Sequence, residues 1–246
     1  MIANATTAAW VHTAFSYAGM TLGAALWRAS LRRQPTGGAL APGNFAVLVG
    51  LLLGAAIGNK LVFLIERPDV VQALWQAGQI AWPGQSIVGG LLGGLIGVEL
   101  AKKLTGQTRS TGDAMVLPIA IGLSIGRVGC FLAGLHDDTY GLPTTAPWGA
   151  DFGDGIARHP TQLYEIAVVL PLGWALHLAR FATPGLAFKL FLSGYLLWRF
   201  AIEFLKPVPV AYPLGLSGIQ WTCLVALAVY APFVARAARP PALATP

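Results

Sequence analysis

The sequence predicts an all-α polytopic membrane protein of about seven transmembrane helices, with the N-terminus outside and the C-terminus in the cytoplasm. Three observations support this prediction: few charged residues, repeated long apolar runs and an uneven distribution of basic residues. The 246 residues are 55% hydrophobic and only 11% charged, whereas a soluble domain carries about 25% charged residues. Much of the surface must therefore face lipid, and we expect a single transmembrane domain over residues 1–246.

The apolar runs give the positions of the helices. A membrane-spanning helix needs about 20 mostly apolar residues. Runs of this kind lie at about 8–27, 45–65, 86–104, 114–135, 160–180, 186–205 and 216–235. The first basic residue, Arg28, follows the first run, whereas a cleaved signal peptide carries its basic residues in front. We therefore expect the first run to be retained as a span.

Basic residues give the orientation, because they concentrate in cytoplasmic loops. With the N-terminus outside, the cytoplasmic segments hold ten Lys and Arg residues and the outer segments hold three. With this orientation, the longest polar connection, about 136–159, lies on the outer side. The basic residues are scattered rather than clustered in a stripe, so we expect no nucleic-acid partner.

The third run is rich in glycine, with a four-residue spacing over residues 89–97. Glycines four apart let two helix backbones approach closely in a membrane. We expect these glycines to pack helices together rather than to bind a ligand.

Charged residues inside the sixth run are the first candidates for function, since a charge in a bilayer costs at least about 2.5–3.5 kcal/mol. Arg199, Glu203 and Lys206 fall on one face of a helix. They form either a functional stripe or a structural Arg199–Glu203 pair, with Lys206 extending to the surface.

Arg127 is the second such charge, within residues 126–131 (GRVGCF), and glycines flank it. Two arginines at similar depth on different helices suit an anion. A guanidinium donates two parallel hydrogen bonds to phosphate. In a membrane the obvious anion is a phospholipid headgroup.

A third feature is the segment 159–165 (HPTQLYE), where Pro160 fits the first turn of a helix. His159 would then stand at the outer mouth of the fifth span, with Glu165 deeper. Function and helix capping both explain this pattern.

Together these segments resemble the prolipoprotein diacylglyceryl transferase family, bacterial membrane enzymes that lipidate lipoprotein precursors. The family combines seven spans with an HGGLIG-like third span and the patterns GRxGNFxNxExxG, HPxQLYE and RxxxEFxR. HPxQLYE is intact at 159–165, while 126–131 and 199–206 match the second and fourth patterns with changes. Tyr17 resembles the family's first-span tyrosine.

The sequence departs from the family pattern at several positions. Val88 stands where the family has a histidine, a proposed proton acceptor, and Cys130 and Ala133 replace its asparagines. Lys206 replaces the final arginine. A short insertion leaves Asp137, Asp138 and Gly141 as loose equivalents of the family's acidic residue and glycine.

The resemblance implies transfer of a diacylglyceryl group from phosphatidylglycerol to the cysteine thiol of a prolipoprotein at the outer leaflet. The implied location is the lipid bilayer of a bacterial inner membrane. Arg127 and Arg199 would hold the phosphate and stabilise the departing glycerol phosphate, and Glu203 would orient Arg199. The other substrate-binding residues implied are Tyr17, Gly141, Gln162, Tyr164 and Glu165.

The base that deprotonates the attacking thiol is left open among His136, His159 and Glu165, since the thiolate is the nucleophile. We expect no cofactor and no metal. Residues 151–155 (DFGDG) offer oxygen atoms without EF-hand spacing, which predicts a polar turn.

Cys130 has two interpretations. It is a small apolar filler, or it reacts, because it follows Arg127 by three residues on roughly the same helix face. A reactive thiol at this position would accept the diacylglyceryl group or relay it covalently.

Three other functions remain as alternatives: a transferase or hydrolase with a different acceptor, a non-catalytic phospholipid-binding protein, and a small-solute transporter. The transporter is disfavoured because the intramembrane charges gather on the outer side.

Overall fold

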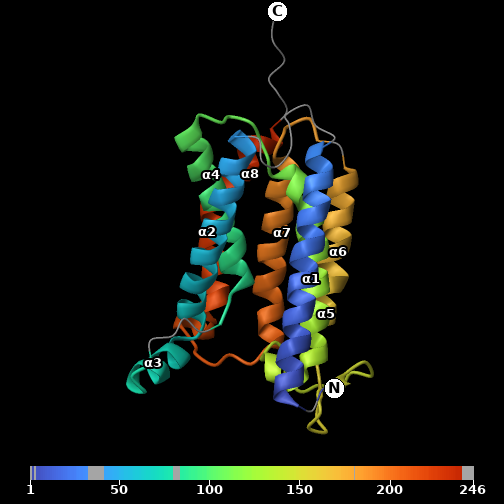
Figure 1. The fold of residues 1–246 in the computed structure, drawn as a ribbon. Coiled ribbons are helices and arrows are strands. Elements are labelled where there is room, and N and C mark those ends of the chain that lie inside the picture. The colour runs from blue at the N-terminus through green and yellow to red at the C-terminus, as the bar shows by residue number, and fades with distance from the viewer. Residues whose placement is uncertain (1, 3, 33–41, 80–83, 180, 240–246) are drawn as a thin grey trace, which may run out of the picture.

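The protein is a bundle of long helices (Figure 1) in a computed structural model that describes residues 2, 4–32, 42–79, 84–179 and 181–239. The all-α prediction is confirmed. Each predicted run corresponds to one long helix. These helices are α1 (Ala5–Arg32), α2 (Pro42–Glu66), α4 (Ile87–Thr105), α5 (Val116–Ala133), α6 (Thr161–Leu178), α7 (Leu186–Ile202) and α8 (Gly218–Ala238).

Short elements connect the long helices. They are α3 (Pro68–Gln76), the 3₁₀ turns η1 (Asp113–Met115), η2 (Gly134–Asp137), η3 (Glu203–Leu205) and η4 (Pro213–Gly215), and the antiparallel pair β1 (Ala150–Asp151) and β2 (Ala157–Arg158). Helix α3 was not predicted from the sequence. The predicted sixth run, about 186–205, corresponds to α7 and the 3₁₀ turn η3 that continues it, because the chain tightens after Ile202.

Three helical segments within the described residues are long and apolar enough to cross a membrane: Asn44–Glu66, Asp113–Asp137 and Gly218–Ala238. These segments support a membrane protein. Seven spans and the orientation stay predictions, and Arg33 and Arg180, which contribute to the basic bias, lie outside the described residues.

Polar connections gather at one end of the bundle, the lower end in Figure 1. The start of α1, α3, the connection between α5 and α6, and the connection between α7 and α8 all lie there. We call it the loop-rich end. Arg127 and Arg199 lie in the last two turns of α5 and in the last turn of α7, so both arginines lie toward this end.

The apolar core lies between α5, α6, α7 and α8, with Val88 of α4 at its edge. Its largest fully buried side chains are those of Phe191, Leu192, Tyr195, Leu196 and Ile219. Packing of this kind fixes the helices around the two arginines.

Glycines join α2 to α4, which confirms the predicted packing role of the third run. A Cβ atom added at Gly54, Gly58, Gly93 or Gly97 would overlap the backbone of the facing helix. A Cβ at Gly93, for example, would lie 2.8 Å from the Cα of Gly58. The two backbones are therefore as close as small-residue packing allows.

Gly93→Ala is expected to lower the thermal midpoint of the purified protein, because overpacking a tight contact costs about 1–3 kcal/mol. Gly90→Ala, on the same helix, is the matched control. Its added Cβ meets only Asn59 Cβ at 3.7 Å, so its midpoint should stay near that of the unchanged protein. Equal midpoints for both variants would contradict the packing account.

Candidate functional site

Two buried arginines form the centre of the candidate site, and each is paired with a glutamate. Arg127 Nη2 lies 2.9 Å from Glu165 Oε2, and Arg199 Nη1 donates to Glu203 Oε2. All four side chains are almost fully buried. The Arg199–Glu203 pair follows from the spacing seen in the sequence, whereas the Arg127–Glu165 pair between α5 and α6 was not predicted.

Tyr195 connects α7, the helix of Arg199, to the Arg127–Glu165 pair. Its hydroxyl donates to Glu165 Oε1 across 3.2 Å, and it lies one turn before Arg199 on α7. Both oxygens of Glu165 are therefore occupied, one by Arg127 and one by Tyr195. This arrangement fixes the orientation of the Arg127 guanidinium relative to α7.

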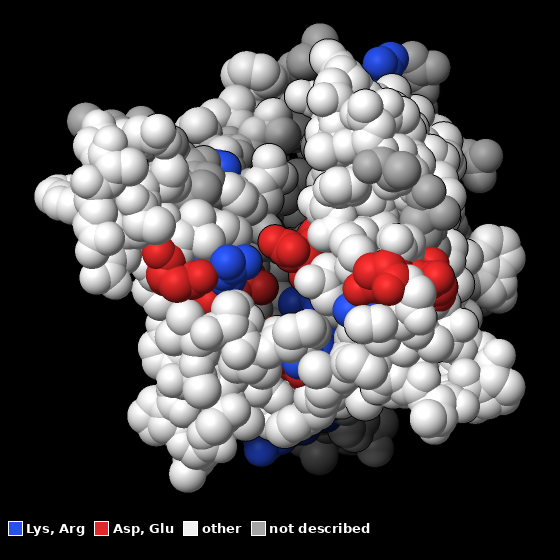
Figure 2. Space-filling view, turned by 90° about the horizontal axis from the view of Figure 1, so that it is seen from below, with Lys and Arg blue, Asp and Glu red and all other residues white. Residues whose placement is uncertain are grey.

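Glu66 at the end of α2 and Lys206 after η3 interact electrostatically with the same charges. The group thus contains three basic side chains (Arg127, Arg199 and Lys206) and three acidic ones. Figure 2 shows the loop-rich end face on, with acidic and basic side chains around a hollow and basic side chains visible within it.

The group has an unused hydrogen-bond donor. Within the described residues, Arg127 Nε is buried and has no hydrogen-bond partner. A buried donor without a partner costs about 1–3 kcal/mol, which an oxygen atom of a bound anion would offset. This nitrogen is the donor of Arg127 that an anion could engage without displacing Glu165.

The segment 159–165 is hydrogen-bonded to the connection between α5 and α6. Gln162 Nε2 donates to Thr139 Oγ1 at 3.1 Å, and Thr161 Oγ1 donates to the Thr139 carbonyl at 2.6 Å. His159 Nδ1 lies 3.2 Å from the hydroxyl of Tyr164. His159 is half-buried and lies two residues before the start of α6, near the helix N-terminus as the sequence predicts.

Two details of this segment differ from or extend the expectation. Pro160 lies at the N-cap position rather than in the first turn. Trp148 Nε1 donates to the Tyr164 hydroxyl at 2.7 Å, so the connection between α5 and α6 folds back onto the segment.

Gly141 lies where three segments meet. Its N–H donates to the carbonyl of His159 at 3.0 Å, and the next N–H, from Leu142, donates to the carbonyl of Leu205 at 2.8 Å. A Cβ at Gly141 would lie 2.9 Å from the Leu205 carbonyl oxygen. Only glycine fits, so Gly141 positions the connection beside η3.

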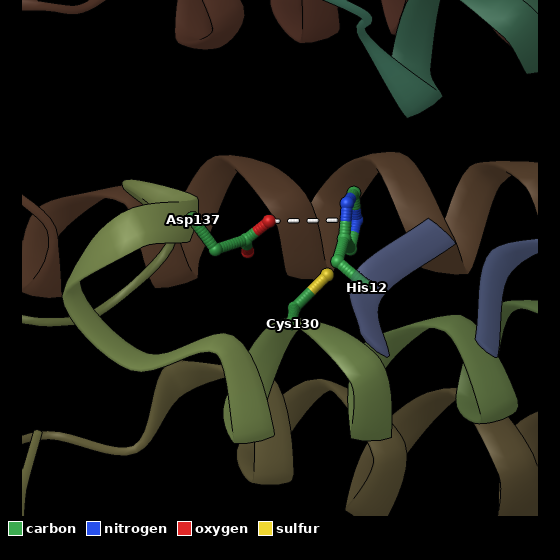
Figure 3. A group of neighbouring side chains, drawn as sticks. All are labelled: His12, Cys130 and Asp137. Carbon is green, nitrogen blue, oxygen red and sulfur yellow. Dashed lines mark ion pairs between the residues drawn. The ribbon is translucent and has the colours of Figure 1, made fainter. Parts of the chain in front are cut away.

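A second polar cluster, missed by the sequence analysis, lies where α1 meets the end of α5. Figure 3 shows His12 of α1, Cys130 of α5 and Asp137 of η2 facing one another. His12 Nε2 is 3.4 Å from Asp137 Oδ1. A histidine inside an apolar run was the available signal, but its partners lie on other elements.

Cys130 also faces Arg127, as its position three residues later predicted. Arg127 Nη1 lies 3.8 Å from Cys130 Sγ, and the sulfur is buried. The polar cluster and the arginine group are therefore adjacent.

The remaining predicted residues lie apart from these contacts. Tyr17 is 64% exposed, and it is about 140° around α1 from His12. His136 is exposed on η2, and Val88 is buried at the start of α4 in the apolar core.

Residues 151–155 form the polar turn that the sequence predicts. Asp151 Oδ1 accepts hydrogen bonds from the N–H groups of Gly153, Asp154 and Gly155. The bond from Gly153 contributes most to holding the pKa of Asp151 below its ordinary value.

Comparisons with known proteins identify the family. A family model for prolipoprotein diacylglyceryl transferase matches residues 8–236. The phosphatidylglycerol–prolipoprotein diacylglyceryl transferase of Nitrosomonas europaea is 31% identical over 229 residues, or 85% of this chain and 79% of that protein. The protein of the same name from Methylobacillus flagellatus is 33% identical over 198 residues, or 76% of this chain and 71% of that protein. Because the family model extends across both buried arginines and the relatives cover most of the sequence, the chain belongs to the prolipoprotein diacylglyceryl transferase family.

Proposed function

We propose that this protein transfers a diacylglyceryl group from phosphatidylglycerol to the cysteine thiol of a prolipoprotein. The observation that carries the proposal is the pair of buried arginines, Arg127 and Arg199, contributed by different helices toward one end of the bundle. The relatives are named for this reaction.

The two arginines would bind the phosphate of phosphatidylglycerol. Glu203 orients Arg199, and Glu165 orients Arg127 while leaving Arg127 Nε available. During transfer a C–S bond forms between the thiolate and the glyceryl carbon. The C–O bond to phosphate breaks, and its electron pair stays on glycerol phosphate. Positive charge fixed beside this leaving group stabilises the transition state.

The substrate thiol must lose its proton before it attacks. His159 is the base that the family pattern favours, and its ring is held by Tyr164. His136 is the alternative, since it is exposed on η2, where solvent and a substrate can reach it. Glu165 is the weaker candidate, because both of its oxygens are already engaged.

We place the reaction at the outer leaflet of a bacterial inner membrane, with seven spans and the loop-rich end outside. The basic bias of the sequence supports this orientation. In a variant without other cysteines, Thr145→Cys should react with an impermeant thiol reagent in intact cells. Thr108→Cys, exposed at the opposite end, should react only after the cells are broken. The reverse pattern would overturn the topology.

Release of glycerol phosphate by the purified protein tests whether it is an enzyme. With phosphatidylglycerol and a peptide that carries the prolipoprotein cysteine, we expect glycerol phosphate to accumulate. Binding of the lipid without release would indicate a non-catalytic lipid-binding protein. Release without any change of the peptide would indicate a hydrolase or another acceptor. Solute flux in protein-containing liposomes, together with no lipid turnover, would indicate a transporter.

A further inference from the structure

His12, Cys130 and Asp137 place three different metal-ligand atoms together. The ring nitrogen, the sulfur and the carboxylate oxygen all lie within 4.8 Å of one another, and they come from α1, α5 and η2 (Figure 3). Nitrogen, sulfur and carboxylate oxygen are the ligands that Zn²⁺ takes in proteins.

The spacing suits tetrahedral coordination. Zinc bonds of about 2.1 Å to nitrogen and oxygen put these two ligands about 3.4 Å apart in a tetrahedron. His12 Nε2 and Asp137 Oδ1 are 3.4 Å apart. A histidine–aspartate pair also explains this distance, and the Cys130 thiol interacts with both Asp137 and Arg127. The convergence of all three ligand atoms is what favours a metal ion.

Hydrogen bonds around the cluster hold Asp137 in place. Thr139 Oγ1 donates to Asp137 Oδ2, and Gln162 Nε2 donates to the same Thr139 oxygen. Oδ1 is thereby left facing His12. Support of a ligating carboxylate by such a chain is typical of metal sites, and it gives Gln162 a positioning role.

The fourth position of a tetrahedral ion would be open. The side chains of Cys130 and Asp137 are buried, whereas that of His12 is 41% exposed, so access lies on the His12 side. Zinc sites with three protein ligands and an open position are typical of catalysis. Arg127 Nη1 lies 3.8 Å from Cys130 Sγ, which puts the three-residue cluster beside the proposed phosphate site.

We propose that His12, Cys130 and Asp137 bind a Zn²⁺ ion whose fourth ligand is the cysteine thiol of the acceptor. This inference rests on the proposed function and departs from the expectation of no metal. Coordination would release the thiol proton to water and hold the sulfur as thiolate. The thiolate then forms the C–S bond while the C–O bond to phosphate breaks, as described above.

Zinc content measures the site independently of activity. Full-length protein in detergent, exposed to zinc and then freed of loosely bound metal, should retain about one zinc ion per chain. His12→Ala, Asp137→Asn and Cys130→Ser should each retain less than about a tenth of this amount. Two controls should keep their zinc: Cys223→Ala, the other buried cysteine, and His177→Ala, an exposed histidine.

Folding of each variant is checked by a single symmetric peak in size-exclusion chromatography. If Cys130→Ser does not fold, Cys130→Asn, which has the family's residue, replaces it. Zinc retained by folded His12→Ala and Cys130 variants would overturn the proposal. The cluster would then be an ion pair between His12 and Asp137, with Cys130 as an apolar packing residue beside it. Protein that binds no zinc would overturn it as well.

Cobalt reports whether the acceptor thiol joins the site. In cobalt-loaded protein, the sulfur-to-metal absorption should roughly double when the acceptor peptide is added, since two thiolates then bind the ion in place of one. A peptide with serine at that position should cause no change. A constant absorption with both peptides would refute the role of the thiol as fourth ligand.

Failure of this inference is distinguishable from failure of the proposed function. Lipid transfer at the full rate by protein without zinc would reject activation of the thiol by the metal and keep the transferase. One zinc ion per chain without any lipid transfer would keep the metal site and reject the transferase.

Discussion

Arg199→Lys is expected to lower diacylglyceryl transfer by at least about 100-fold, because the lost donor acts on developing charge in the transition state. Lysine keeps the positive charge beside Glu203 but lacks the planar fork that binds two phosphate oxygens. The measurement is the rate at which purified protein modifies an acceptor peptide at saturating phosphatidylglycerol.

Lys189→Ala is the matched control, since it removes a basic residue from the other end of the same helix. It should keep the full rate. If Arg199→Lys also keeps the full rate and lipid affinity, the site is a simple charge pair and the two-pronged binding of phosphate is wrong.

Glu165→Ala is expected to destabilise the protein by about 3–5 kcal/mol, because it leaves the buried guanidinium of Arg127 without its partner. The double variant Arg127→Met/Glu165→Leu removes both charges and should recover most of that stability. It should remain inactive, since the phosphate loses one of its two arginines. Thermal unfolding and peptide modification measure the two effects separately.

An active double variant would show that the Arg127–Glu165 pair serves the fold alone. A double variant as unstable as Glu165→Ala would show that Tyr195, which donates to Glu165, or local packing depends on the carboxylate more than Arg127 does.

The sequence predicts the long helices well because a helix that spans a lipid bilayer must be long and apolar, and both properties can be read from each run alone. It also predicts the Arg199–Glu203 pair, since residues four apart on one helix face one another. The packing role of the glycines in α4 follows from their spacing in the same way, whereas the identity of the partner helix, α2, does not.

Contacts between helices could not be predicted in this way. Arg127 and Glu165 meet because α5 packs on α6, and no spacing within one run indicates that neighbour. His12 meets Cys130 and Asp137 because α1 packs on α5 and the chain turns sharply into η2. The short helix α3 was missed because its nine residues are too few to show a clear helical periodicity next to the long apolar run of α2.

Mass spectrometry of the acceptor peptide tests the transferase account most directly. Purified protein is incubated with phosphatidylglycerol of defined acyl chains and a peptide that carries the prolipoprotein cysteine. The account predicts that the peptide gains the mass of one diacylglyceryl group on its cysteine sulfur, with one glycerol phosphate released for each modified peptide. A peptide that stays unmodified while the protein binds phosphatidylglycerol, or cleaves it, would contradict the account.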